Sequence, residues 1–235
     1  MKVYSIKIEQ TSILIFAVII LSCLFYTYKN ENSVTAMMPT NNKTIIIDAG
    51  HGGWDPGKIG NTGDNEKVIN LNITLKLQQY LEQSGANVVV TRNIDEALGK
   101  KKKEDMNERK KIAEENEGDI LVSIHQNSFP SQRAKGAQVF YYEGSENSEK
   151  LAQCVQNSFK ENVDNENIRE AKPNTSYYIL KKISIPAIIV ECGFLSNEEE
   201  EKKLNTEEYQ EKIAWAIYSG IINYFEEEDE KIVKN

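Results

Sequence analysis

From about residue 43 onward, apolar and polar positions follow two alternating patterns along this chain. Short apolar runs rich in β-branched residues are typical of buried strands, and the longer segments between them have the apolar spacing of amphipathic helices. The short runs predict strands at 43–48, 87–91, 119–125, 137–142, 177–180 and 187–191. The longer segments predict helices at 65–83, 104–116, 145–162 and 207–226. This alternation predicts an α/β fold: a single three-layer domain whose central, mostly parallel (mixed) sheet of about six strands has helices on both faces.

The N-terminal pattern is different. Lys2 and Lys7 precede a continuous apolar stretch at 13–26, whose length lies between that of a signal-peptide core and that of a membrane-spanning helix. We therefore expect export, by a segment that is either cleaved or kept as an anchor. The chain divides into four predicted parts: 1–28 as signal peptide or signal anchor, 29–42 as linker, 43–226 as the folded domain and 227–235 as a charged tail.

Composition and charge narrow the possible functions. A chain of 235 residues that is 40% apolar can form a full core, and a formal charge of −8 argues against nucleic acid as a partner. Only Cys154 and Cys192 lie in the predicted domain, which is too few for a disulfide framework. We expect both thiols to be buried, and neither has a nearby histidine to act as its base, so a cysteine nucleophile is disfavoured.

The only two histidines of the chain lie at the ends of predicted strands. His51 follows the first apolar run and His125 ends the third. In open α/β sheets, ligands bind beyond the carboxyl ends of the strands, so both imidazoles are expected in one crevice. Imidazole is a common metal ligand, and two histidines with one carboxylate form a known set of catalytic zinc ligands. The pattern therefore directs attention to nearby carboxylates.

Three carboxylates are candidates, each with an alternative structural role. Glu66 opens a predicted helix, where it is either a residue favoured by the helix dipole or a zinc ligand. Glu191 ends a buried strand, where it needs a partner: water activated by a metal, or a salt bridge to Arg92 or Arg109. Asp48 is either a third ligand or a group that orients a histidine.

Four motifs carry a family resemblance. In order they are DAGHGGWDPG at 48–57, NEK at 65–67, SIHQN at 123–127 and PAIIVECGFLSN at 186–197. Together they resemble the zinc-dependent N-acetylmuramoyl-L-alanine amidases of the Amidase_3 class, over about 43–224. Two positions depart from the usual pattern, because Gln126 and Lys58 stand where small residues are common.

The resemblance implies a site and a reaction. It implies that His51, Glu66 and His125 bind one zinc ion per chain and that Glu191 is the catalytic carboxylate. The implied reaction is hydrolysis of the amide bond between N-acetylmuramic acid and L-alanine in peptidoglycan. Zinc lowers the pKa of bound water to about 7 and polarises the carbonyl, so the carboxylate has only to move a proton.

Further substrate contacts are predicted with their alternatives. Arg92 either contacts carboxylates of the stem peptide or forms a structural ion pair, as does Arg109. Trp54, close to His51, either stacks on sugar or peptide or packs the loop. Asn127 is either a polar contact near the metal or a turn residue.

The layout, an export segment leading into one catalytic unit, resembles the germination-specific amidases of spore-forming bacteria. That resemblance implies action on spore cortex as a step towards muramic δ-lactam and functional coupling to a peptidoglycan deacetylase. Whether an accessory lipoprotein activator is a further partner is left open by the sequence. The expected location is extracytoplasmic, in the cell wall or the spore intermembrane space. The alternatives are a vegetative autolysin or cell-separation amidase, a non-catalytic peptidoglycan-binding regulator, and a different zinc hydrolase such as a peptidoglycan peptidase or deacetylase.

Overall fold

The computed structural model describes residues 13, 15–24 and 38–234, and the chain forms two units, 1–38 and 39–235. In the first unit, residues 15–24 are helical and exposed. Among the described residues, no helix has both the length and the apolar character needed to cross a membrane. Most of the predicted export segment 1–28 and linker 29–42 lies outside the described residues.

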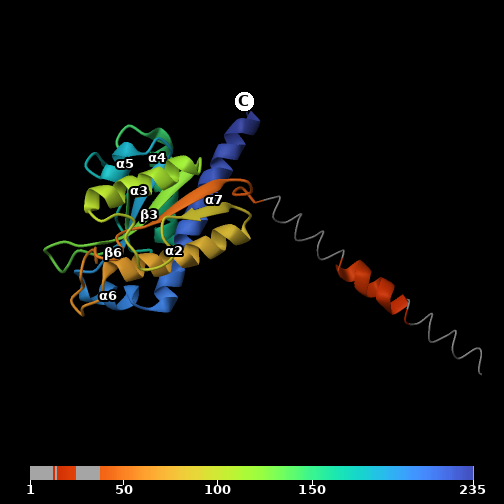
Figure 1. Cartoon of the computed structure of the whole chain (residues 1–235), viewed down its shortest axis with the longest axis horizontal. Coiled ribbons are helices and arrows are strands. Elements are labelled where there is room, and N and C mark those ends of the chain that lie inside the picture. Colours follow the sequence, from red (N-terminus) through yellow and green to blue (C-terminus); the bar gives the residue numbers. More distant parts are fainter. Residues whose placement is uncertain (1–12, 14, 25–37, 235) are drawn as a thin grey trace, which may run out of the picture. The chain divides into compact units, whose positions relative to one another are not determined.

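The second unit is built on a six-stranded sheet (Figure 1). Its strands stand in the order β2-β1-β3-β6-β4-β5, all parallel to their neighbours except β4, which runs antiparallel to β6. Their bounds are β1 Thr44–Ala49, β2 Asn87–Val90, β3 Ile120–Asn127, β4 Gln138–Tyr142, β5 Lys172–Asn174 and β6 Ala187–Phe194. The predicted mostly parallel, mixed sheet of about six strands is confirmed.

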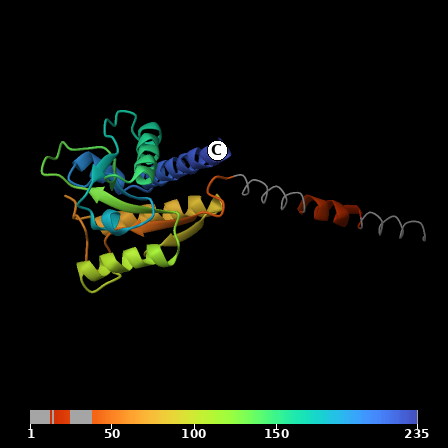
Figure 2. The ribbon, with the colours of Figure 1, turned by 90° about the horizontal axis from the view of Figure 1, so that it is seen from above.

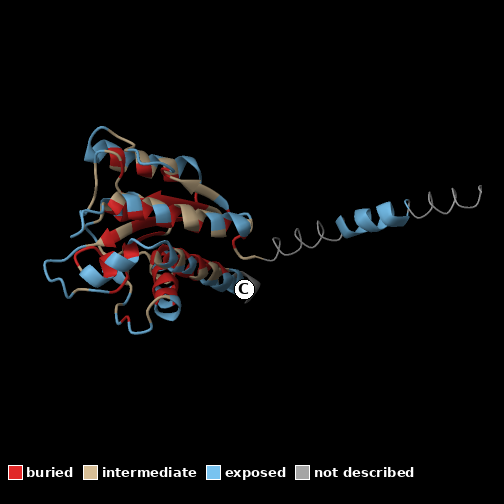
Figure 3. Cartoon of the chain, turned by 90° about the horizontal axis from the view of Figure 1, so that it is seen from below, coloured by how far each residue is buried: buried red, intermediate tan, exposed pale blue. Residues whose placement is uncertain are grey.

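Helices cover both faces of this sheet. They are α2 Glu66–Gln83, α3 Lys102–Glu115, α4 Glu146–Asn162, α5 Tyr178–Lys182, α6 Glu198–Leu204 and α7 Glu207–Lys234. The larger apolar core joins one face of the sheet to α2, α4 and α7, and a smaller core joins the other face to α3 and α5. Figure 2 shows α3 (yellow-green) and α7 (blue) on opposite sides of the sheet. Buried residues gather along the strands and on the inner sides of the helices (Figure 3).

One predicted strand is wrong. Residues 177–180, predicted as a strand, lie at the start of the short helix α5. The strand that completes the six-stranded sheet is β5, a few residues earlier in the chain. The side chain of Asn174 explains the change, because its Oδ1 accepts hydrogen bonds from the backbone N–H groups of Ser176 and Tyr177. Such a side-chain turn bends the chain out of the extended conformation. A short apolar run has no period that distinguishes a strand from one helical turn.

The C-terminal part contains more helix than the pattern predicted. Asn197 precedes helix α6 and caps it, because its side chain accepts hydrogen bonds from the backbone N–H groups of Glu199 and Glu200. Helix α7 continues past the predicted end at 226 and includes the segment predicted as a charged tail up to Lys234. Pairs such as Lys231 with Glu228 support a solvent-exposed helical turn.

The two cysteines of this unit are buried, as predicted. Cys192 follows Glu191 in β6 and belongs to the larger apolar core, whereas Glu191 lines a cavity. Successive side chains of a strand point to opposite faces, which accounts for this separation. Burial raises the pKa of both thiols, to about 11 for Cys154.

Candidate metal centre and catalytic cavity

The carboxyl ends of β1, β3 and β6 bring the predicted site residues together. These three strands are neighbours and run parallel, so their ends meet at one edge of the sheet. His51 lies two residues beyond β1, and His125 stands opposite Glu191 in the register of β3 with β6. The imidazole rings of His51 and His125 are 5.0 Å apart between centroids. Both histidines therefore lie in one crevice.

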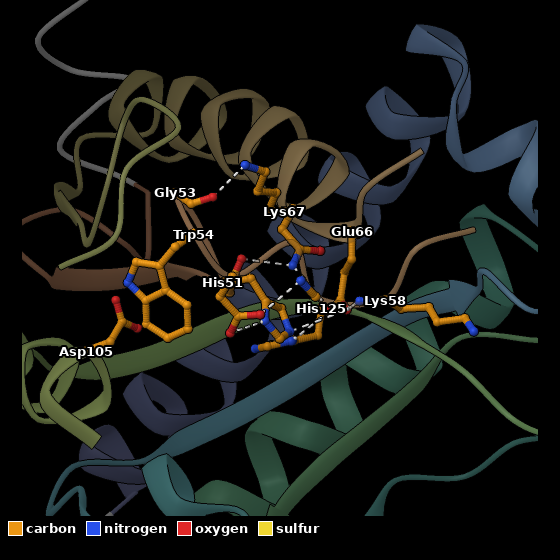
Figure 4. A network of polar contacts seen from close by, with 12 residues as sticks. His51, Gly53, Trp54, Lys58, Glu66, Lys67, Asp105 and His125 are labelled. Atoms are coloured by element: carbon orange, nitrogen blue, oxygen red, sulfur yellow. Dashed lines mark hydrogen bonds and ion pairs between the residues drawn. The ribbon is translucent and has the colours of Figure 1, made fainter. Parts of the chain in front are cut away.

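Three side chains in this crevice form a candidate metal site (Figure 4). Donor atoms of His51, Glu66 and His125 all lie within 4.8 Å of one another, the one such group of three or more among the described residues. Oε2 of Glu66 is 3.3 Å from Nε2 of His51, and its Oε1 is 3.0 Å from Nδ1 of His125. Two imidazoles and one carboxylate, with room for water, fit the donor set of catalytic zinc.

Glu66 holds a charge at the centre of this group. It is the first residue of α2 and is buried. Burial raises the pKa of its carboxyl, but the hydrogen bonds with His125 and His51 outweigh burial and hold the pKa well below its ordinary value. The carboxylate is therefore ready to bind a cation.

The loop before α2 shapes the approach of His51 to Glu66. Gly57 has a φ of 67°, and a Cβ at this position would lie 2.6 Å from Oε2 of Glu66 and 2.8 Å from Cδ2 of His51. Oδ2 of Asp55 lies 2.9 Å from Nδ1 of His51, which orients the ring and leaves Nε2 facing Glu66. We did not predict Asp55, although its position four residues after His51 in the first motif was a signal.

Lys58 and Gln126, the two residues that depart from the family pattern, both contact Glu66 through their backbone N–H groups. The N–H of Lys58 donates to Oε2 of Glu66 at 2.8 Å, and the N–H of Gln126 donates to Oε1 at 3.0 Å. Figure 4 shows the Lys58 side chain extending away from this group. Backbone donors are independent of side-chain identity, which explains why these two positions tolerate change.

Glu191 lines a cavity of about 350 Å³ next to the three candidate ligands. Its side chain is buried, and burial raises the pKa of its carboxyl to about 7, because the opposing effect of His125 is smaller. Oε2 of Glu191 has no hydrogen-bond partner in the described part of the chain, and Oε1 accepts a hydrogen bond from Tyr177 at 3.4 Å. Neither Arg92 nor Arg109 forms the salt bridge that was the alternative.

Asp48, which was considered above as a third ligand, has other polar partners. It is buried beneath the site, where it accepts hydrogen bonds from Ser123, Thr91 and Arg109. Burial by itself raises the pKa of its carboxyl, but the Arg109 guanidinium and the Ser123 hydroxyl outweigh burial and lower the pKa to about 2. Asp48 is not a member of the candidate metal group.

Of the predicted substrate contacts, Arg109 lines the cavity, and Arg92, Trp54 and Asn127 do not. Trp54 is half-exposed and donates its Nε1–H to Gly99, and Oδ1 of Asn127 accepts from the N–H of Ser128. Their roles towards substrate stay predictions. Arg92 is buried and donates to backbone carbonyl groups, so we replace its expected substrate contact with a structural role.

Sequence reasoning missed the wall of the cavity that α3, Tyr177 and the start of α5 provide. Its side chains include Lys102, Met106, Tyr177, Tyr178 and Ile179. The sequence held no motif for these residues, because they come to the site only through the packing of α3 and α5 on the same face of the sheet. They supply an apolar surface with one cation at its rim.

Comparison with known proteins shows the family of this chain. Residues 45–223 match the family model described as N-acetylmuramoyl-L-alanine amidase. The germination-specific N-acetylmuramoyl-L-alanine amidase of Bacillus subtilis is 35% identical over 230 residues, covering 94% of this chain and 96% of the relative. The N-acetylmuramoyl-L-alanine amidase LytC of the same organism is 33% identical over 190 residues, covering 80% of this chain and 36% of LytC.

Solved structures give the same result. The CwlD amidase from Clostridioides difficile, solved in complex with the GerS lipoprotein, is 46% identical with a TM-score of 0.77, covering 79% of this chain and 99% of that chain. The N-acetylmuramoyl-L-alanine amidase AmiC2 of Nostoc punctiforme is 34% identical with a TM-score of 0.70, covering 78% of this chain and 97% of that chain.

Proposed function

Because this chain belongs to the N-acetylmuramoyl-L-alanine amidase family and is a peptidoglycan amidase of that class, we propose a zinc-dependent mechanism for its reaction. In this proposal His51, Glu66 and His125 hold one zinc ion, and Glu191 is the catalytic carboxylate. The observation that carries it is the buried Oε2 of Glu191, which lacks a hydrogen-bond partner among the described residues and lines the same cavity as the three candidate ligands.

Glu191 moves the proton in this mechanism. When bound, zinc lowers the pKa of water and polarises the scissile carbonyl. Glu191 takes a proton from the attacking water and returns it to the leaving nitrogen of L-alanine as the carbon–nitrogen bond breaks. A carboxyl whose pKa is raised to about 7 is suited to both steps near neutral pH. Its burial excludes competing hydrogen bonds from bulk water.

The experiment that tests this mechanism is digestion of purified peptidoglycan by the wild type and by Glu191→Gln, followed by mass analysis of the products. We expect the wild type to release peptides that begin with L-alanine and the variant to lose activity by about 1,000-fold or more, because it lacks the proton acceptor. Glu143→Gln, on an exposed turn, is the matched control and should keep wild-type activity.

Zinc content separates the possible failures of this experiment. Glu191→Gln should bind one zinc per chain like the wild type, because Glu191 is not one of the proposed ligands. Equal digestion by both proteins would refute the role of Glu191. Release of acetate with intact stem peptides would instead indicate a deacetylase, cleavage within the stem would indicate a peptidase, and a zinc-loaded wild type without any release would indicate a non-catalytic regulator.

We propose spore cortex as the setting of the reaction. One relative is named germination-specific, and one solved neighbour is a complex with a lipoprotein, which supports an accessory lipoprotein for this chain. The proposed product is the peptide-free muramic acid from which, after a deacetylase acts, muramic δ-lactam forms. The reaction would take place outside the cytoplasmic membrane, reached through the N-terminal segment as signal peptide or anchor.

Muropeptide analysis of spores tests this setting. We expect cortex from a deletion strain to lack muramic δ-lactam and its spores to fail in germination. Normal cortex combined with defective separation of vegetative cells would favour the autolysin alternative, for which the similarity to LytC is the supporting observation.

A further inference from the structure

Two buried arginines that the proposed reaction does not use donate hydrogen bonds to the backbone of the loop that carries His51. Arg92 follows β2, and Arg109 lies in α3; each has 2% of its surface exposed. Arg109 forms ion pairs with Asp48 and Asp105. Within the described part of the chain, no carboxylate forms an ion pair with Arg92. A fully buried guanidinium without an ion-pair partner has a large cost of desolvation, which indicates a specific role.

Arg92 donates to three consecutive carbonyl groups, and Arg109 donates to two of the same three. Nε of Arg92 is 2.9 Å from the oxygen of Ala49 and 2.8 Å from that of His51, and its Nη2 is 3.0 Å from that of Gly50. Nη1 of Arg109 is 2.8 Å from the oxygen of Ala49, and its Nη2 is 2.7 Å from that of His51. Every carbonyl from Ala49 to His51 therefore points at a cation.

This arrangement matters because of the backbone conformation of His51. Its φ is 61°, in the left-handed region that residues with a side chain rarely adopt. The two hydrogen bonds to its carbonyl oxygen hold the residue there, and the conformation directs its imidazole towards Glu66. A planar guanidinium with five N–H donors can bind several carbonyl groups at once, whereas a lysine ammonium cannot reproduce that fork.

The same network reaches the other two candidate ligands. Nη2 of Arg92 also donates to the carbonyl of Lys67, the residue after Glu66, at 2.8 Å. Asp48, the ion-pair partner of Arg109, accepts a hydrogen bond from Ser123, which precedes His125 by two residues in β3. One connected set of polar contacts thus joins the three chain segments that carry the ligands.

We propose that Arg92 and Arg109 are positioning residues, which hold the backbone at His51 and Glu66 in the metal-binding arrangement before the metal binds. This inference rests on the proposed zinc site. It concerns the affinity for the metal and the order of the metal-free loop, and it makes no use of the chemical step.

Arg92→Lys tests the proposal, because it keeps the positive charge and removes the fork. We expect the Kd for zinc, measured by competition with a chromophoric chelator, to rise 10- to 100-fold, the usual effect of losing a group that orients a metal ligand. The d–d spectrum of the cobalt-substituted protein should change with it. In the metal-free protein, amide hydrogen exchange at 48–57 should become faster.

Arg169→Lys is the matched control. Arg169 also donates to a backbone carbonyl, that of Lys135 at 2.6 Å, but among the described residues it has no contact with the segments that carry the ligands. Its replacement should leave the zinc Kd and the exchange at 48–57 unchanged. If Arg92→Lys and Arg169→Lys both lowered the thermal stability and neither changed the zinc Kd, Arg92 would have only a structural role.

The outcomes distinguish this inference from the proposed function. A wild type that binds no zinc would refute the zinc site, and hydrogen exchange in the metal-free protein would still decide the role of Arg92. A folded Arg92→Lys protein with a wild-type Kd and wild-type exchange would overturn the inference. If Arg92→Lys does not fold, Ser123→Ala takes its place: loss of its single hydrogen bond to Asp48 should weaken zinc binding about fivefold, and an unchanged Kd would overturn the network.

Discussion

The hydroxyl of Tyr177 lies 3.4 Å from Oε1 of Glu191, and its ring packs edge-on against Phe140 at 5.6 Å between centroids. Burial and the neighbouring Glu191 raise the pKa of Tyr177 to about 12, so the hydroxyl stays protonated and acts as a donor. Tyr177 is therefore placed to hold one oxygen of Glu191 and leave the other for the proposed proton transfer.

Tyr177→Phe should lower kcat about 10-fold and change KM little, because it removes one hydrogen bond to a charged group and keeps the ring. Steady-state hydrolysis of a defined muropeptide measures the effect. Tyr178→Phe is the control, since the Tyr178 hydroxyl binds the exposed Asn107. Equal kcat values for the two variants would contradict the role of Tyr177.

Asp48 predicts how stability depends on pH. Its pKa is about 2 in the folded protein against an ordinary value of 3.8, so its contribution to stability is complete above about pH 4 and is lost as the pH falls through about 2. The contribution is about 2 kcal/mol. Urea unfolding at pH 6, 4 and 2.5 should show this loss in the wild type.

In Asp48→Asn the loss of stability on acidification should be smaller than in the wild type by about 2 kcal/mol. Its free energy of unfolding at pH 6 should already be about 3 kcal/mol lower than that of the wild type, because Arg109 loses a buried partner. Parallel pH dependence in the two proteins would count against Asp48 as a buried carboxylate.

At the scale of single residues, the motifs predicted site residues that lie at the ends of strands or at the start of a helix. They did not predict residues that reach the site only through the packing of distant segments. His51 and His125 came from their positions at strand ends and Glu66 from the family resemblance, and the structure brings the three together. Tyr177 reaches the site from a segment that was assigned to a strand. The burial of Arg92 depends on how loops close over it, and no local pattern encodes that.

Among the elements, α4 and α7 make an unusually close contact at Gly220. A Cβ at this position would lie 2.5 Å from Cα of Val155. Gly220→Ala should therefore lower the free energy of unfolding by about 1–3 kcal/mol, although alanine favours helix over glycine by about 1 kcal/mol. Chemical denaturation measures this change. Ser219→Ala, on a partly exposed position of the same helix, is the control and should stabilise or be neutral; a more stable Gly220→Ala protein would refute the close packing.

The pattern of apolar positions located long elements well and short ones poorly. Helices α2 and α4 and strands β1, β3 and β6 lie close to their predicted ranges, because each buries an apolar stripe or run. Helix α3 also lies close to its predicted range, although its buried residues are Asp105, Arg109 and Ala113. The short elements α5, α6 and β5 depend on side-chain turns and caps, at Asn174 and Asn197, that compete with the apolar signal.

Over the whole molecule, the proposed zinc ligands join chain segments that are distant in sequence. His51, Glu66 and His125 come from the loop after β1, the start of α2 and the end of β3. The unfolded chain does not hold them together, so zinc should stabilise the folded state by about 4 kcal/mol at a free concentration 1,000-fold above its Kd. The layered α/β arrangement that assembles them was predictable, because alternating strands and helices have few ways to bury their apolar faces.

Chelation should therefore remove activity and lower the Tm of the protein by about 10 °C, and added zinc should restore both. Differential scanning calorimetry with and without a chelator measures the shift. An unchanged Tm in a protein that binds zinc would contradict this prediction, because a ligand that binds only the folded state must raise the Tm.

The burial of Cys192 beside Glu191 bears on chemical durability. A thiolate one residue from the proposed catalytic carboxylate would compete for the proposed zinc ion and react with peroxide, but this thiol belongs to the apolar core and its raised pKa keeps it protonated. Cys154 is protected in the same way. The catalytic unit should therefore resist oxidative inactivation and alkylating reagents while it is folded, a property suited to surroundings that lack cellular reductants.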